Sequence, residues 1–426
     1  MTAEFLNWTN RNLRVIYAAG LLRSAGAGLT GVLLGVYLSR SGFSASQIGL
    51  VITAGLAACA AGTLAVGLFA DRLGRRRTLV GLSVLTTVGG AGFALVGGFW
   101  GILLLSFLGM VNGMGTDRSP SFSLDQAIIP QTAPVNRRTA ALSWYSMIMD
   151  IGHSLGALGA GLPLLLQHWF PLGLLTCYRV TFGIYAGLNA LTAGAYLTLS
   201  PEAEMTEKPI SQGRAGRVSA QSRSVITKLA FLSGIDSLGG GFLTDALLAY
   251  WFFHRFGFQE GSLGLLFSAG NILNSGSYVI AAWLARRIGL LNTMVFTHIP
   301  SSLLLMAVPF SPSPAWAAVL YLAWESLVEM DVPTRQSYLM AVVKPSERTL
   351  ATGVTNFARS ASRSITPSAA GYVMQHVALA TPLFLGGSLK IAYDIMLYSA
   401  FRRLKPPEEL ASVSSATPAA DAGTTT

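Results

Sequence analysis

Two glutamates, Glu325 and Glu329, lie four residues apart in an otherwise mostly apolar stretch of the chain. On a helix, which turns about 100° per residue, they would project from one face, about 40° apart. Two carboxylates at this spacing repel each other when both are ionised, which favours a proton on one of them. The spacing therefore predicts a coupled pair that takes up and releases a proton. The alternatives are a site for a cationic ligand, or structural ion pairs with Arg359 and Arg363.

Two further pairs have a spacing that places them on one helix face. Asp331 and Arg335 are four residues apart beside Pro333, and they predict a structural ion pair at a kink. Asp150 and His153 are three residues apart. These two could relay a proton, or they could simply satisfy each other in a core.

Basic residues with helical spacing occur closer to the C-terminus. Arg359 and Arg363 share one face, and they predict either acidic partners in the stretch 315–343 or an anionic group of a ligand. Lys390 and Asp394 are also four residues apart and predict a local ion pair.

Asp236 and Asp245 lie on one apolar stretch but nine residues apart, which puts them on opposite faces of a helix. They are therefore not expected to serve one site. The run Gly239–Gly241 between them predicts a bend, because glycine weakens a helix.

The composition defines the elements that must position these residues. Charged residues make up only 11% of the 426 residues and hydrophobic residues make up 52%. A soluble domain has about 25% charged residues, so a soluble enzyme, a disordered chain and a collagen-like fibre are excluded. Two cysteines and five scattered histidines give no disulfide scaffold and no metal cluster, so neither a metal nor a cofactor is expected.

Apolar stretches long enough to cross a bilayer, which takes about 20 residues, recur along the chain. Each is expected to be a helix, because lipid cannot satisfy free backbone groups. The sequence thus predicts an all-α membrane protein with twelve transmembrane helices, at residues 13–38, 46–69, 78–97, 99–128, 139–166, 172–199, 225–253, 262–284, 289–310, 315–343, 350–375 and 379–402.

The basic residues are distributed unevenly between the two sides of such a bundle. If the N-terminus is cytoplasmic, 20 of the 29 lysines and arginines lie in cytoplasmic segments, three lie outside and six lie within spans. This bias predicts that both termini are cytoplasmic, in an inner (plasma) membrane. It also accounts for the net charge of +10 without nucleic acid, which is not an expected partner.

A polar segment divides the chain into two halves. We expect an N-terminal six-helix half at 1–199, a cytoplasmic linker at 200–224, a C-terminal half at 225–404 and a disordered cytoplasmic tail at 405–426. The sequence PVNRRT at 134–139 recurs as PSERT at 345–349, about half the chain later. This recurrence predicts two pseudo-symmetric bundles.

The segment GLFADRLGRRR at 67–77 resembles the loop signature of major facilitator superfamily (MFS) transporters of the bacterial type, between the second and third spans. Gly67 permits close helix packing, and Gly74 permits a tight reversal of the chain. Asp71 can face the N-terminus of a neighbouring helix. The resemblance implies that the loop gates the cytoplasmic side through a contact with the eleventh span. The matching residues are Gly67, Asp71, Arg72, Gly74, Arg75, Arg76 and Arg77.

Two other signatures of this family match in part. In the fourth span Gly109 occupies the position of an arginine linked to proton coupling, and Arg118, about two turns later, is the available substitute. In the fifth span the glycines of an antiporter signature are present without its Gly-Pro, which favours export slightly.

The resemblance implies that the first, fourth, seventh and tenth spans line a central cavity. It places six residues there first, namely Arg23, Asp117, Arg118, Asp236, Glu325 and Glu329. The remaining candidates for the substrate and proton cavity are Asp150, His153, Asp331, Arg335, Arg359 and Arg363.

The function that follows is secondary active transport of a small solute by alternating access of two halves. Protons are the expected driving ion, efflux is slightly favoured over uptake, and a monomer without enzymatic activity is expected. Nine acidic residues against six basic ones within the spans leave open a uniporter or a metal-ion carrier. A membrane sensor or assembly protein that transports nothing is the alternative from another class.

Overall fold

The computed structural model describes residues 10–117, 119–134, 137–204, 220–343 and 347–402. In these ranges the chain forms helices joined by short turns, without strands, which confirms the all-α fold. The predicted tail 405–426 lies outside the described residues, as does most of the linker. The helices are α2 (Arg11–Arg40), α3 (Ala45–Leu73), α4 (Arg75–Leu95), α5 (Phe99–Gly109), α6 (Pro120–Thr132), α7 (Arg138–Leu158), η2 (Gly159–Gly161), α8 (Leu162–Trp169), α9 (Leu174–Leu197), η3 (Pro201–Ala203), α10 (Ala220–Gly241), α11 (Asp245–Phe256), α12 (Glu260–Ile288), α13 (Leu290–Ala307), η4 (Val308–Phe310), α14 (Pro314–Val328), α15 (Asp331–Val342), α16 (Arg348–His376) and α17 (Thr381–Phe401).

Three of the predicted continuous helices are in fact broken, so the helices outnumber the predicted stretches. The stretch 99–128 forms α5 and α6, 225–253 forms α10 and α11, and 315–343 forms α14 and α15. The bend predicted at Gly239–Gly241 is confirmed, because α10 ends there.

At the helix breaks, backbone groups that lose their helical hydrogen bonds find other partners. Such groups must be satisfied within a membrane, because lipid offers no hydrogen bonds. The amide of Ala246, at the start of α11, donates to the carbonyl of Gly113, in the segment between α5 and α6. The hydroxyl of Ser106 donates to the carbonyl of Val111 over 2.6 Å. Broken helices of this kind often surround the binding sites of transporters.

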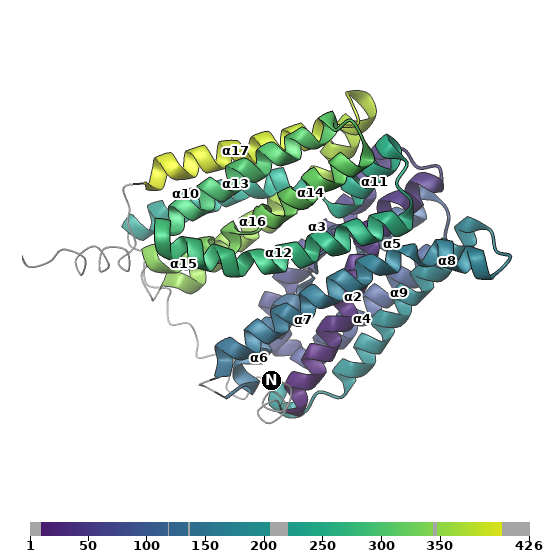
Figure 1. Ribbon diagram of the computed structural model, residues 1–426. Helices are drawn as coiled ribbons and strands as arrows, with labels where there is room; N and C mark the ends of the chain where they lie inside the picture. Colours follow the sequence, from purple (N-terminus) through teal and green to yellow (C-terminus); the bar gives the residue numbers. More distant parts are fainter. Residues whose placement is uncertain (1–9, 118, 135–136, 205–219, 344–346, 403–426) are drawn as a thin grey trace, which may run out of the picture.

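The helices form two groups, α2–α9 and α10–α17, which touch at one end and diverge at the other (Figure 1). We call the end at which Arg11, Gly74 and Arg402 lie the open end. The opposite end, at which Gly42, Gly257 and His376 lie, is the closed end. The apolar core cluster around Leu34 and Trp251 joins the two groups near the closed end.

Glycines allow the two halves to pack closely at the closed end. A Cβ at Gly49 of α3 would lie 2.2 Å from the carbonyl oxygen of Pro367 in α16, and one at Gly264 of α12 would lie 2.6 Å from that of Ala157 in α7. The α3–α16 and α7–α12 contacts correspond to each other when the halves are exchanged, as pseudo-twofold symmetry requires.

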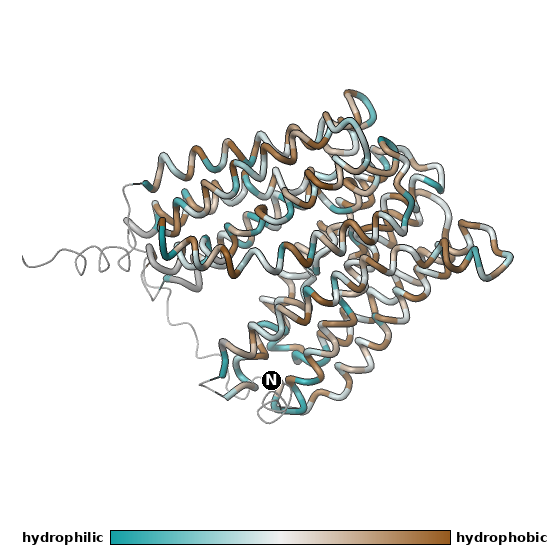
Figure 2. The backbone as a smooth tube through the Cα atoms, viewed as in Figure 1, coloured by the Kyte–Doolittle hydropathy of each residue, from teal (hydrophilic) through white to brown (hydrophobic). Residues whose placement is uncertain are grey.

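The outer faces of the bundle are apolar. Figure 2 shows hydrophobic residues along the length of the helices in both halves, and many large apolar side chains are exposed, among them Leu95, Trp100 and Val279. Within the described parts of the chain, five helical segments are long and apolar enough to cross a bilayer by length and composition. Exposed apolar surface of this extent is the surface expected against lipid.

Replacing Gly49 with leucine should prevent α3 and α16 from closing, because there is no room even for a Cβ. In a chain without Cys59 and Cys177, a cysteine introduced by Thr53→Cys at this contact should react with a thiol reagent several-fold faster. The control is Gly276→Leu, since a Cβ there meets no atom within 4 Å. Equal labelling rates in the two variants would contradict the prediction.

Candidate functional site

A buried ion cluster surrounds Arg23 in the N-terminal half. Its guanidinium pairs with Asp117 in the break before α6, and with Asp125 in α6, at 3.0 Å between Nη2 and Oδ2. The hydroxyls of Tyr145 and Tyr196 contact both the guanidinium and the Asp125 carboxylate. The predicted residues Arg23 and Asp117 thus lie together, and the tyrosines supply the extra hydrogen bonds that a buried ion pair needs.

His153 connects this cluster to the other half of the molecule. Its Nε2 accepts a hydrogen bond from the backbone amide of Asp117 over 2.9 Å, and its Nδ1 lies 3.9 Å from Asp150 Oδ1. Asp150 Oδ2 in turn accepts from the hydroxyl of Ser275 in α12, over 3.1 Å. The predicted pair Asp150–His153 is therefore part of a polar chain that crosses the interface between the halves.

A second ion cluster is centred on Asp236 of α10, in the C-terminal half. Asp236 Oδ1 lies 3.2 Å from Lys390 Nζ, and Oδ2 lies 2.9 Å from Arg359 Nη1 and 3.4 Å from Arg335 Nη1. Arg335 also pairs with Asp331 one turn earlier, which confirms the predicted contact of these two residues. Three cations therefore surround one buried carboxylate.

One predicted partnership in this cluster is wrong. Lys390 does not pair with Asp394; its Nζ lies 3.1 Å from His298 Nε2, and His298 Nδ1 lies 3.0 Å from Asp394. Lys390 pairs with Asp236 of α10 instead, because a partner from a distant helix satisfies this buried charge better than a neighbour on the same helix. Arg359 also pairs with Asp236, on a helix that the sequence did not indicate.

Arg363 lies one turn beyond Arg359 on α16, and its guanidinium lies against Gly240 at the end of α10. Arg118, which was predicted to line the cavity, lies outside the described residues.

Glu325 lies buried near the end of α14. Its Oε1 accepts from the hydroxyl of Tyr321 over 3.0 Å and its Oε2 accepts from the amide of Asn274 over 3.3 Å. Glu329 follows at the C-cap of α14, half-buried and close enough to interact electrostatically with Glu325. Asp245, at the start of α11, interacts with Glu325 as well.

Asp245 and Asp236 lie in different surroundings, as their opposite faces predicted. Asp245 is packed against the glycines of the first and fourth spans: a Cβ at Gly115 would lie 1.7 Å from its Oδ2, and one at Gly31 would lie 3.4 Å away. Asp236 belongs to the basic cluster. The position of Asp245 near Glu325 was not predicted, because it depends on where α10 ends.

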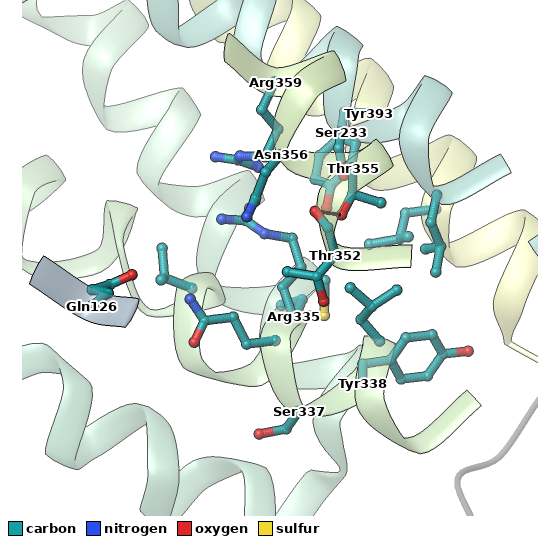
Figure 3. A pocket seen from close by; sticks show the side chains of 16 residues that line it. Gln126, Ser233, Arg335, Ser337, Tyr338, Thr352, Thr355, Asn356, Arg359 and Tyr393 are labelled. Atoms are coloured by element: carbon teal, nitrogen blue, oxygen red, sulfur yellow. Dashed lines mark hydrogen bonds between the residues drawn. The ribbon is translucent and has the colours of Figure 1, made fainter. Parts of the chain in front are cut away.

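A cavity of about 680 Å³ lies toward the open end, mostly within the C-terminal half (Figure 3). Arg335, Arg359 and Asn356 border it, and Gln126 of α6 faces it from the other half. Of the described residues that line it, the charged ones are Arg335 and Arg359.

The motif at 67–77 forms the turn between α3 and α4. Gly74 has φ of +93°, which confirms the predicted tight reversal. The close packing predicted at Gly67 is wrong, since a Cβ there meets no atom within 4 Å. Asp71 pairs with Arg75 over 2.8 Å within its own half, and the side chains of Arg72 and Arg77 are exposed while that of Arg76 is half-buried.

The carboxylate at the N-terminus of α4 is Glu204 rather than Asp71. It accepts from the backbone amides of Arg75, over 2.6 Å, and Arg76, over 3.1 Å. This anion satisfies free amides and the helix dipole. The two halves diverge at this end of the bundle (Figure 1), so the motif lies where they would meet if this end closed.

The closed end has an ion pair between the halves that sequence reasoning missed. Arg40 Nε, at the end of α2, lies 2.7 Å from Oε1 of the fully buried Glu260, the first residue of α12. The hydroxyl of Tyr178 in α9 donates to the same oxygen. Nothing in the spacing of three isolated residues predicts this contact, because they lie on three different helices.

Replacing Glu260 with glutamine should weaken the closed end, because charge-assisted bonds to a buried carboxylate contribute about 1.5–3 kcal/mol. The open end should then close more often. In a cysteine-free chain, the thiol introduced by Asn356→Cys in the cavity should be labelled about tenfold more slowly. Glu202→Gln, which neutralises an exposed glutamate, is the control, and an equal rate in both variants would rule out a role in closure.

The chain matches a known protein family over most of its length. A model of the Major Facilitator Superfamily matches residues 16–416, and the chain belongs to that superfamily. It is 25% identical over 422 residues to an uncharacterized membrane protein of Saccharomyces cerevisiae, covering 92% of this chain and 94% of that protein.

Solved transporters share the fold at low sequence identity. The nucleoside transporter NupG matches with a TM-score of 0.71 and 15% identity, over 92% of this chain and 100% of that chain. A D-xylose–proton symporter matches with 0.69 and 15%, over 91% and 97%. The inward open conformation of the xylose transporter XylE from E. coli matches with 0.70 and 14%, over 94% and 98%. The chain is therefore a multi-pass membrane protein of a transporter superfamily.

Proposed function

We propose that the protein is a proton-coupled secondary transporter that moves a small organic solute by alternating access. The observation that carries the proposal is the cavity of about 680 Å³ toward the open end of a bundle whose other end is closed. The volume is within the range of small-molecule sites, about 300–1,000 Å³. Arg40 and Glu260 join the halves at the closed end, and such a contact must break when that end opens.

In this proposal the halves 1–199 and 225–404 rock against each other as a monomer. The protein lies in the plasma membrane, and its open end faces the cytoplasm, because most of the basic residues lie at that end. The motif loop, with Asp71 and Arg75, closes the cytoplasmic side in the opposite state. The pseudo-symmetric contacts α3–α16 and α7–α12 are the surfaces on which the halves turn.

Glu325 is the proposed proton carrier. It is buried among Tyr321, Asn274 and Asp245, and its two oxygens accept hydrogen bonds from the neutral side chains of Tyr321 and Asn274. A second carboxylate nearby disfavours ionisation of both at once. Glu325 lies beside the helix breaks, where a change between states alters its surroundings most.

The rival of a metal-ion carrier receives less support. Among the described residues, no group of three or more His, Cys, Asp or Glu side chains could hold a metal ion. The glycines of the fifth span, in α7 and η2, remain the feature that favours efflux, while a symporter is among the proteins of similar fold.

Proteoliposomes that contain a pH-sensitive dye test the proposal. External solutes from a small-molecule library are added, and the internal pH is followed. Solute–proton symport acidifies the interior and antiport makes it alkaline, so the sign gives the coupling mode. Solute uptake without a pH change indicates a uniporter, and the absence of any flux for all solutes would favour a sensor or assembly protein.

A further inference from the structure

Among the described residues, the charged side chains that line the cavity at the open end are all positive. Arg335 and Arg359 are the charged side chains among the described residues that line it, and the carboxylates Asp236 and Asp331 lie behind them, each 3% exposed. Asp394 is further from the cavity, behind His298, and is fully buried. A solute that enters the cavity therefore meets the cations first.

The arginines are held at the wall of the cavity by the carboxylates behind them. Arg359 comes from α16 and Arg335 from α15, and both bind Asp236 through a single guanidinium nitrogen, Nη1. A guanidinium has five N–H donors in a planar fork that matches a carboxylate or a phosphate. Figure 3 shows both side chains reaching into the same space.

The rest of the lining suits an organic body of mixed polarity. Gln126, Gln336, Asn356 and Thr352 supply neutral polar groups. The apolar part of the wall consists of Leu229, Met294, Val332, Leu339 and Leu397, with the rings of Tyr338 and Tyr393. Neutral polar groups beside an apolar wall fix the orientation of a ligand without opposing a negative charge.

We infer that the transported solute is an organic anion, with a carboxylate or phosphate group bound by Arg335 and Arg359 and an apolar body against the tyrosine side of the cavity. This inference rests on the proposed function and names its substrate class. When the anion binds, Asp236 keeps Lys390 as its partner, 3.2 Å away, so Arg359 can turn toward the solute without leaving that carboxylate unpaired. Arg335 keeps its Nη1 on Asp331 and offers its other N–H donors to the anion.

Binding of defined probes to the full-length chain in lipid nanodiscs tests the inference. The probes are benzoate, phenylacetate, hexanoate, citrate, phenyl phosphate and glucose 6-phosphate, with benzamide, glucose and benzylamine as neutral and cationic counterparts. The measurement is the shift of the thermal unfolding midpoint with probe concentration. We expect only anions to stabilise the protein, with either the carboxylates or the phosphates binding more tightly according to the group that the site recognises.

Arg359→Gln is the decisive variant, because Asp236 retains Lys390 and Arg335 and the fold should persist. It should weaken anion binding about 10- to 100-fold, as expected for the loss of charge-assisted hydrogen bonds. Arg359→Lys keeps the positive charge but lacks the planar N–H donors of a guanidinium, and it should lose less of the anion affinity. Arg255→Gln removes an exposed cation at the closed end and should change nothing.

The outcomes separate the inference from the proposed function. If no anion binds, or if neutral or cationic probes bind equally well to the wild type and to Arg359→Gln, the inference is wrong. Dye-loaded proteoliposomes then show whether transport itself fails. Flux of a neutral solute that does not depend on Arg359 would support the proposed transport function and contradict the inference of an anionic substrate. Anion binding that depends on Arg359, without any flux, would contradict the proposed transport function and support the anion site.

Discussion

Replacing Glu325 with glutamine should abolish proton-driven accumulation while solute exchange continues. Glutamine keeps the size of the side chain and can still bond to Tyr321 and Asn274, so the packing at the end of α14 should survive. It carries no exchangeable proton in the working pH range, and therefore resembles the protonated carrier at all times. The expected phenotype is a transporter that equilibrates its solute and cannot concentrate it.

The size of the effect follows from the energy in the gradient. One pH unit corresponds to about 1.4 kcal/mol, which can sustain up to about a tenfold concentration ratio for one proton per solute. The wild type should approach that ratio in proteoliposomes with a one-unit gradient, and Glu325→Gln should stay near one. Counterflow of labelled solute should be similar in both. Accumulation like that of the wild type would exclude Glu325 as the proton carrier.

Two related variants show which neighbour shares this role. Asp245→Asn should also impair coupling if the carboxylates of the seventh and tenth spans act as a unit, and Glu329→Gln should do so if the pair is the one within α14. Glu202→Gln is the matched control, because it removes an exposed acid outside the spans. A loss in all four variants would indicate a general effect of charge and not a carrier.

Replacing Asp236 with asparagine should destabilise the protein more than any other single neutralisation of an acid in the C-terminal half. The carboxylate is the shared partner of Lys390, Arg359 and Arg335, and all four side chains are largely buried. Removing one partner of a buried ion pair costs about 3–5 kcal/mol, since the remaining charge has lost its compensation. Here three cations would also repel one another.

The measurement is the thermal unfolding midpoint of the purified protein, together with the yield of folded protein. Asp236→Asn should lower both strongly. The double variant Asp236→Asn with Lys390→Met removes one of the uncompensated cations and should recover part of the loss. If the single variant is as stable as Glu202→Gln, the cluster is not a structural centre of the C-terminal half.

The parts of the structure that could be predicted are those that depend on neighbours in sequence. The lengths of the apolar stretches predicted where helices lie. The glycines at 239–241 predicted the end of α10, and Gly74 predicted the reversal before α4. The contact between Asp331 and Arg335 was predictable because one helical turn joins them.

Partners from distant segments could not be predicted. A buried charge requires a partner, but the requirement does not say which helix supplies it. Lys390 thus contacts Asp236, 154 residues away, rather than Asp394. Glu204 reaches the N-terminus of α4 from 129 residues away, and Arg40 and Glu260 are 220 residues apart. The helix breaks were largely missed for a related reason, since hydrogen bonds such as that from Ala246 to Gly113 replace the lost helical ones.

Alternating access is the central claim, and paired distance measurements test it without knowledge of the solute. One pair of spin labels, at Thr198 and Arg286, spans the open end, and another, at Leu172 and Ala378, spans the closed end; all four positions are exposed. Distances are measured by pulsed electron resonance in nanodiscs, for the wild type and for Glu260→Gln. The account predicts reciprocal changes in Glu260→Gln: a longer distance at the closed end and a shorter one at the open end. A change at only one end, or at neither, would contradict it.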